Sequence, residues 1–181
     1  PEVLRYADVP DPICGPDDVI IAVEAISIEG GDLINRRFTH HPSSWIVGYA
    51  AAGTVVAVGE NVRGRDVGEK VAAFHMEGSH AELWAVPAAR TWRIPNNLGM
   101  GEAAALPIAF GSAYHSVITK GALREGETVL IQAAAGGVGV AAVQLARDSG
   151  ATVIAVASGP ERQSRLAKLG AAYVIERHVQ D

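Results

Sequence analysis

The chain has 181 residues, 49% of them hydrophobic and 19% charged, so it can bury a substantial core in one large domain or two small ones. The formal net charge is −5 and the longest basic run is the pair Arg36-Arg37, which argues against a nucleic-acid or acidic-membrane surface. A single cysteine, Cys14, excludes an internal disulfide and a thiolate-rich zinc site, and we expect a cytoplasmic protein.

Residues 1–96 predict a small antiparallel β-barrel or sandwich. Short runs of β-forming residues alternate there with glycine and proline, which is typical of strands joined by turns. The expected strands cover residues 18–28, 53–59, 70–74, 80–87 and 91–95.

Beyond Asn96 the pattern changes to helices that alternate with strands. The first helix is expected to have Pro107 near its start and to run through "IAFGSAYHSVIT", and strands follow at residues 128–133, 151–157 and 173–175. This alternation predicts a parallel sheet of right-handed βαβ units. The most apolar window, residues 129–146, is long enough for a membrane helix, but its glutamines and glycines favour strand, turn and helix.

The stretch "TVLIQAAAGGVGVAAVQLAR" places three glycines, Gly136, Gly137 and Gly139, between a strand ending near Ala134 and a helix to about Arg147. Glycines at such a turn let backbone amides at a helix N-terminus bind a pyrophosphate. The fingerprint G-x-G-x-x-G has alanine at its first position here, and a tight turn without a ligand also fits the glycines. The second apolar strand, at the spacing of a mononucleotide unit, favours the phosphate-binding interpretation.

The end of that second strand favours NADPH over NADH. An NAD site usually has an acid there to bind the ribose hydroxyls, but this chain has Ala157, Ser158 and Gly159. Ser158 and Arg162 would suit a ribose 2′-phosphate. Two alternatives stay open, because Ser158 and Glu161 have the spacing of a capping box, and Arg162 and Arg165 also fit a solvated helix face.

Four stretches carry a resemblance to a known family. They are "PEVLRYADVPDP", "GYAAAGTVVAVGENVRGRDVGEKVAAF", "AAALPIAFGSAYHSVITKGALREGETVLIQAAAGGVGVAAVQLAR" and "LAKLGAAYVIE". They resemble the zinc-independent quinone reductase branch of the medium-chain dehydrogenase/reductase superfamily, which includes enoyl reductase and ζ-crystallin relatives. The resemblance implies a mostly β GroES-like catalytic domain over residues 1–96 and an α/β Rossmann-type NADPH-binding domain over residues 97–181, with the active site in the cleft between them.

The departures from zinc-dependent relatives predict that no catalytic metal is bound. The positions that match the family's metal ligands carry Glu29, Tyr49 and Ala50, and there is no four-cysteine lobe. The histidines are interpreted as solvated or core residues, which applies to His40, His41, His75 and His80. Relatives often have asparagine at the position of Glu29, so its charge either lies beside the nicotinamide or pairs with Arg36 or Arg37.

Carried over residue by residue, the resemblance implies a set of cofactor contacts. The pyrophosphate falls on Gly136, Gly137, Val138 and Gly139, and the 2′-phosphate on Ser158, Arg162 and Arg177, where relatives often have a tyrosine for Arg177. The nicotinamide end falls on Gly30, Gly31, Asp32 and Ser112. Loop and helix-start structure is the alternative for these four, since Asp32 is also a natural N-cap.

The substrate pocket is expected to be an apolar cleft for a planar molecule, lined by Glu29, Trp45, Tyr49, Phe74 and Phe110, although core packing explains the aromatic residues equally well. The product of reduction also needs a proton, and Tyr49, Tyr114 or water would deliver it.

The expected function is zinc-independent hydride transfer from NADPH to a quinone or an activated enone. The alternatives are a non-catalytic, crystallin-like NADPH-binding protein and an enoyl reductase segment of a polyketide or fatty-acid synthase. Family members begin before Pro1 and continue beyond Asp181, so we expect this chain to be a fragment of a longer enzyme that forms a homodimer.

Overall fold

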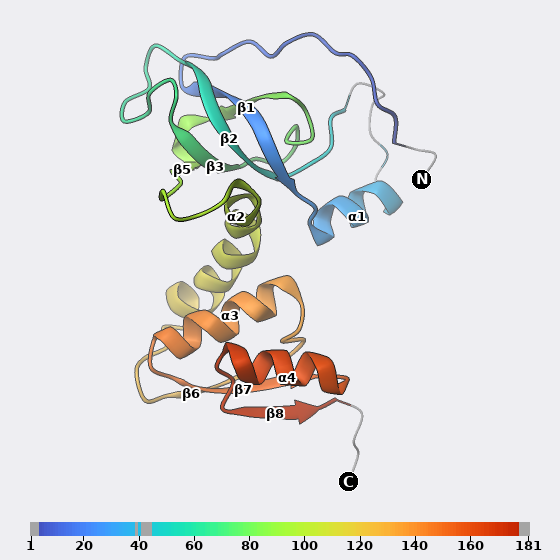
Figure 1. Ribbon diagram of the computed structural model, residues 1–181, viewed down its shortest axis with the longest axis vertical. Coiled ribbons are helices and arrows are strands. Elements are labelled where there is room, and N and C mark those ends of the chain that lie inside the picture. Colours follow the sequence, from blue (N-terminus) through green and yellow to red (C-terminus); the bar gives the residue numbers. More distant parts are fainter. Residues whose placement is uncertain (1–3, 39, 41–44, 178–181) are drawn as a thin grey trace. The chain divides into compact units, whose positions relative to one another are not determined.

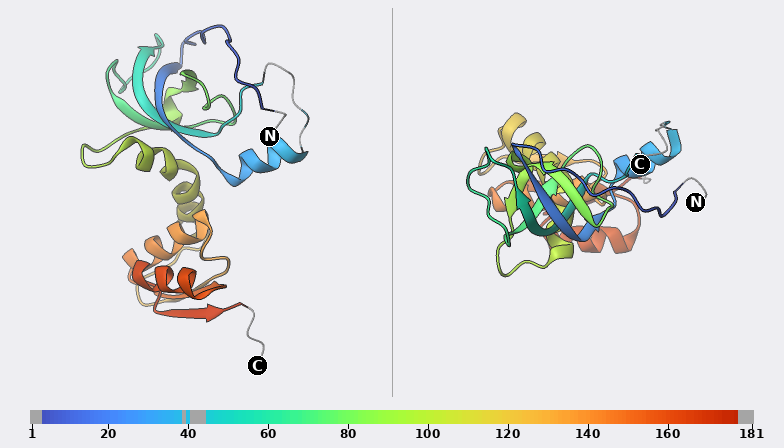
Figure 2. Two further views of the ribbon diagram at one scale, coloured as in Figure 1. Left: turned by 45° about the vertical axis from the view of Figure 1, so that its right-hand side comes forward. Right: turned by 90° about the horizontal axis from the view of Figure 1, so that it is seen from above.

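The computed structural model describes residues 4–38, 40 and 45–177, so His41 lies outside the described part (Figures 1 and 2). The chain divides into two compact units, Pro1–Ile108 and Ala109–Asp181. The division falls within helix α2, Met100–Tyr114, and the boundary expected after Asn96 lies in the loop before that helix. Each unit is described by itself.

The first unit contains a five-stranded antiparallel sheet with the order β4-β1-β2-β3-β5 (Figure 1). This confirms the antiparallel prediction. Its elements are β1 (Asp18–Ser27), α1 (Gly30–Phe38), β2 (Ala50–Val58), β3 (Lys70–Phe74), β4 (Leu83–Pro87), the 3₁₀-helix η1 (Ala88–Arg90) and β5 (Thr91–Arg93).

One strand begins later than expected. The run predicted from His80 becomes strand β4 only at Leu83. The amides of Ser79 and His80 instead donate to the carbonyls of Gly48 and Val47, at 3.3 and 3.0 Å, so these residues pair with a loop.

The sheet of the first unit is packed on both faces. Successive residues of a strand point to opposite sides, and β2 accordingly sends Ala51 into one apolar cluster and Ala52 into another. The first cluster includes Ile21 and Trp84, and the second includes Ala103 and Ala104 from the first half of α2. The N-terminal half of α2 therefore belongs to the core of the first unit.

The second unit contains a three-stranded parallel sheet with the order β6-β7-β8, which confirms the predicted βαβ units. Its elements are the π-helix η2 (His115–Lys120), β6 (Thr128–Ile131), α3 (Gly137–Asp148), β7 (Thr152–Ala157), α4 (Pro160–Leu169) and β8 (Tyr173–Glu176). Figure 1 shows α3 and α4 on the same side of this sheet. Val143 of α3, Leu166 of α4 and Val153 of β7 form the core between them.

Helix α2 begins seven residues before Pro107, so the expectation that Pro107 lies near the start of a helix was wrong. The start is set by Gly99, whose carbonyl accepts from the Ala103 amide at 2.9 Å and whose amide donates to the Glu102 carboxylate at 3.0 Å. A proline inside a helix removes one backbone hydrogen-bond donor. The apolar packing of α2 compensates for that lost hydrogen bond.

Gly139 is required by the packing of α3 on the turn that follows β6. A Cβ at this position would lie 2.5 Å from the carbonyl oxygen of Ala133 and 2.6 Å from the Cα of Ala134. Both are backbone atoms, so the clash cannot be relieved by the movement of a flexible side chain. By contrast, the nearest neighbour of a Cβ at Gly137 would be the Ala109 Cβ, 3.9 Å away.

We therefore expect Gly139→Ala to lower the free energy of unfolding by about 2 kcal/mol, since overpacking of this kind costs roughly 1–3 kcal/mol. Gly137→Ala is the matched control and should leave it unchanged or raise it by up to about 1 kcal/mol, because alanine favours the helix. Urea denaturation of both variants measures the difference. Equal stabilities would show that α3 can move away from β6.

Candidate functional site

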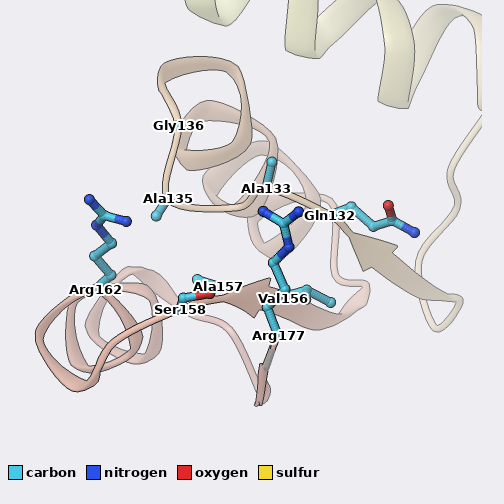
Figure 3. A pocket seen from close by; sticks show the side chains of 9 residues that line it. All are labelled: Gln132, Ala133, Ala135, Gly136, Val156, Ala157, Ser158, Arg162 and Arg177. Carbon is cyan, nitrogen blue, oxygen red and sulfur yellow. The ribbon is translucent and has the colours of Figure 1, made fainter. Parts of the chain in front are cut away.

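A cavity of about 610 Å³ lies in the second unit, between the loop after β6 and the ends of β7 and β8 (Figure 3). It is lined by Gln132, Ala133, Ala135, Gly136, Val156, Ala157, Ser158, Arg162 and Arg177. The carboxyl ends of parallel strands form the edge at which open α/β sheets bind ligands. The position of the cavity is therefore that of a ligand site in this class of fold.

The loop that leads into α3 is held by its own backbone. The Gly136 amide donates to the Ala133 carbonyl at 3.0 Å, and the Ala134 amide donates to the Val156 carbonyl at 3.1 Å. Ala133 has a φ of +50°, so the sharp turn itself is made at an alanine.

Gly136 and Gly137 are not required by the fold. Gly136 has a φ of −79°, which any residue can adopt, and a Cβ there would lie 3.4 Å from its nearest neighbour. Gly137 has even more room. The interpretation as a tight turn without a ligand accounts for Gly139 but not for these two. Their missing side chains leave the N-terminus of α3 open to close approach, as a phosphate group needs.

Two guanidinium groups reach the cavity from different elements. Arg162 projects from α4 and Arg177 follows β8, and Figure 3 shows them on two sides of the Ala135–Gly136 loop, with Ser158 below. Neither guanidinium makes a hydrogen bond or an ion pair with any residue that the structure describes. Their positive charge adds to the positive end of the α3 dipole, so the cavity suits an anion.

The capping box considered for Ser158 is not formed. Helix α4 begins at Pro160, so its N-cap is Gly159 rather than Ser158, and the N-cap residue makes no side-chain capping hydrogen bond. The hydroxyl of Ser158 makes no hydrogen bond within the described residues, and it lines the cavity.

The sequence analysis missed an acid beside the cavity. Glu176, the last residue of β8, accepts hydrogen bonds at Oε2 from the Gly159 amide at 3.0 Å and from Gln163 Nε2 at 2.7 Å. An NAD site has its acid at the end of the second strand, but this carboxylate comes from the third. The parallel register, which pairs Ala157 with Glu176, is the signal that would have found it.

The candidates for the nicotinamide end lie at the start of α1 in the first unit. Glu29 Oε1 accepts a hydrogen bond from the Ser27 hydroxyl at 2.6 Å, and Asp32 Oδ2 accepts one from the Glu29 amide at 2.7 Å. The helix begins at Gly30, so Asp32 caps it from the third position. The structure gives Glu29 no ion pair with Arg36 or Arg37, both of which it describes.

Tyr49 packs against the same helix. Its hydroxyl accepts a hydrogen bond from Asn35 Nδ2 at 2.6 Å, and a Cβ at Gly31 would lie 2.7 Å from its ring. Gly31 therefore makes the space that Tyr49 fills. The sequence analysis missed Asn35, although residues four apart share a helix face and Gly31 was already a candidate.

The other predicted residues are more scattered. Phe110 packs against the core of the second unit, which supports ordinary packing for that ring. Phe74 is half-buried, with the Arg90 guanidinium 6.0 Å from its ring centroid, and Trp45 is also half-buried. The remaining three are exposed on helices, namely Ser112, Tyr114 and Val138.

The described residues contain neither a cluster of metal ligands nor a membrane-spanning helix. No group of three or more His, Cys, Asp or Glu side chains gathers there in a way that could hold a metal ion. Among the helices of that same part of the chain, none is both long and apolar enough to cross a membrane.

Comparison with known proteins gives the family. Residues 15–105 match the family described as the alcohol dehydrogenase GroES-like domain, and residues 137–181 match the family described as zinc-binding dehydrogenase. The chain is 36% identical over 174 residues to the synaptic vesicle membrane protein VAT-1 homolog of Rattus norvegicus, and this match covers 94% of the chain and 43% of the relative.

Two solved structures share the fold. A quinone oxidoreductase of Pseudomonas syringae pv. Tomato DC3000 has a TM-score of 0.91 and 31% identity, and the match covers 99% of this chain and 56% of that one. The quinone oxidoreductase of Escherichia coli complexed with NADPH has a TM-score of 0.90 and 26% identity, with the same two coverages, 99% and 56%.

The chain thus spans less than half the length of the VAT-1 homolog and a little over half of each oxidoreductase. Within that span, the first unit matches the GroES-like family, and the second unit has the partial parallel sheet of a Rossmann-like fold. The chain therefore belongs to the medium-chain dehydrogenase/reductase superfamily.

Proposed function

We propose that the chain is part of an NADPH-dependent oxidoreductase that transfers a hydride to a quinone or an activated enone without zinc. The observation that carries the cofactor proposal is the pair of guanidinium groups, Arg162 and Arg177, which have no described partner and line one cavity with the glycine loop of α3. Unpaired arginines in a preformed cavity favour a strongly anionic ligand.

The residues present fit this cofactor. The first amides of α3, from Gly137 to Gly139, have no partner in the preceding turn and would hold the pyrophosphate, and Gly136 and Gly137 leave room for it. Ser158, Arg162 and Arg177 would hold the ribose 2′-phosphate. The E. coli quinone oxidoreductase complexed with NADPH supports a nicotinamide cofactor for this fold.

Bound NADPH would supply a hydride, which carries two electrons, and the reduced acceptor would then need a proton. Tyr49 is our candidate donor of that proton. Its hydroxyl already accepts from Asn35 Nδ2 at 2.6 Å, so its own hydrogen is left to be donated. Gly31 and Asn35 fix the ring and the hydroxyl from one helix face, which orients the group.

The cofactor preference is tested by Arg162→Ala and Arg177→Ala. A charge-assisted hydrogen bond contributes roughly 1.5–3 kcal/mol, so each variant should bind NADPH about tenfold or more weakly and bind NADH as before. Arg165→Ala is the matched control, because Arg165 lies on α4 but does not line the cavity. Calorimetric titration measures all affinities. Equal losses for both cofactors would place the 2′-phosphate elsewhere.

The glycine loop is tested by Gly137→Asp. Aspartate in the first turn of a helix is favoured by the helix dipole and the site has room for a side chain, so the protein should remain folded. Its carboxylate would repel a pyrophosphate, and we expect at least a hundredfold loss of affinity for both cofactors, on the order of 3 kcal/mol. Gly137→Asn, of similar size and uncharged, is the control. Unchanged NADPH binding by the aspartate variant would refute the loop as the phosphate site.

The proton donor is tested by Tyr49→Phe in the longest form of the protein that is active. General acid catalysis contributes about 10²–10⁴-fold, so kcat with an enone should fall by about a hundredfold while the Kd for NADPH stays the same. Tyr114→Phe, in an exposed position of α2, is the control. An unchanged kcat in both variants would assign the proton to water. NADPH binding without oxidation by any quinone or enone would instead indicate a non-catalytic, crystallin-like protein.

A further inference from the structure

A hydrogen-bond network ties together three chain segments beside the cavity. Glu176 Oε2 accepts from the Gly159 amide at 3.0 Å and from Gln163 Nε2 at 2.7 Å. Gln163 Nε2 also donates to the Ala157 carbonyl at 3.3 Å. The network therefore joins the end of β7, the first turn of α4 and the end of β8.

Of the four network residues, Ala157 lines the cavity itself, and each of the other three is the chain neighbour of a residue that lines it. Gly159 follows Ser158, Gln163 follows Arg162, and Glu176 precedes Arg177. These are the three side chains assigned to the 2′-phosphate. Displacing any network residue would move the backbone of one of them.

The turn at Gly159 needs such a restraint. Gly159 has a φ of +91° and a ψ of 138°, a conformation that is accessible mainly to glycine. Glycine has the largest conformational freedom to lose, so an external acceptor on its amide limits where the turn can go. Glu176 supplies that acceptor.

We infer that Glu176 is a positioning residue for cofactor selectivity, an inference that rests on the proposed NADPH site. Its carboxylate does not line the cavity, and its Oε2 is occupied by two N–H donors. It therefore acts through the placement of Ser158, Arg162 and Arg177. This separates it from the acid of an NAD site, which binds the ribose hydroxyls directly.

A second role is possible on chemical grounds and makes the opposite prediction. A carboxylate near a 2′-phosphate repels it, so an acid that acted by charge would weaken NADPH binding and favour NADH. Removing its charge would then strengthen NADPH binding. The two roles therefore differ in the sign of the effect.

The test uses calorimetric titration of NADPH and NADH with the wild-type protein, Glu176→Ala and Glu176→Gln. We expect Glu176→Ala to bind NADPH roughly tenfold more weakly with NADH unchanged, since it loses hydrogen bonds to a charged acceptor. Glu176→Gln keeps a carbonyl acceptor and should restore NADPH affinity to within about threefold of wild type. Glu161→Gln removes one nearby charge outside the network and should change neither affinity.

A second variant keeps the test decisive if Glu176→Ala does not fold. Gln163→Ala removes one donor of the network in a helix that tolerates alanine, and should lower NADPH affinity about threefold with NADH unchanged. The inference is overturned if the variants of Glu176 bind NADPH more tightly, or if they lose both cofactors equally. Wild-type protein that binds neither cofactor would overturn the proposed function itself.

Discussion

The contact at Gly139 between α3 and the turn that follows β6 is the constraint on which the candidate cofactor site depends. With no side chain there, the helix can start next to the backbone of Ala133 and Ala134. That approach places the N-terminus of α3, with its unpaired amides, at the carboxyl edge of the parallel sheet. The glycines of the loop consequently have different roles, because Gly139 serves packing whereas Gly136 and Gly137 leave space.

The charges of the site depend on the same edge. Ser158 and Arg177 follow β7 and β8, and Arg162 lies in the first turn of α4, which follows β7 directly. Two arginines that pair with none of the described residues cost little in this position because they are exposed to solvent. The same arginines would become strong ligands once an anion excluded part of that solvent. The site is thus compatible with a stable fold before any ligand binds.

Signals that lie close together in the sequence predicted most of the second unit and of the residues that line its cavity. Residues within one turn, or within one strand and the next helix, were enough to predict the three parallel strands and the glycine loop. The same holds for Ser158 and Arg162, which line the cavity. Signals that depend on register between segments were missed. Glu176 meets Gly159 only because β8 lies parallel to β7, and no spacing along the chain indicates that contact.

The position of Pro107 shows a second limit of local signals. Proline is common in the first turn of a helix, so the sequence placed Pro107 near the helix start. The hydrogen bond between Gly99 and Glu102 instead starts the helix seven residues earlier. Helix α2 then contributes Ala103 and Ala104 to the core of the first unit and Ala113 to that of the second. Packing on both units outweighs the one backbone hydrogen bond that the proline removes, which a propensity argument could not anticipate.

The first unit uses the same physical device as the second. Gly31 provides space for the ring of Tyr49, just as Gly139 provides space for the backbone of the turn that follows β6. In each case a glycine at the start of a helix lets a neighbouring group approach closely, and a polar contact then fixes it. Asn35 fixes the Tyr49 hydroxyl, and the Gly136 amide fixes the turn at Ala133. A substitution at either glycine would therefore act on the candidate site through geometry, without removing any polar group from it.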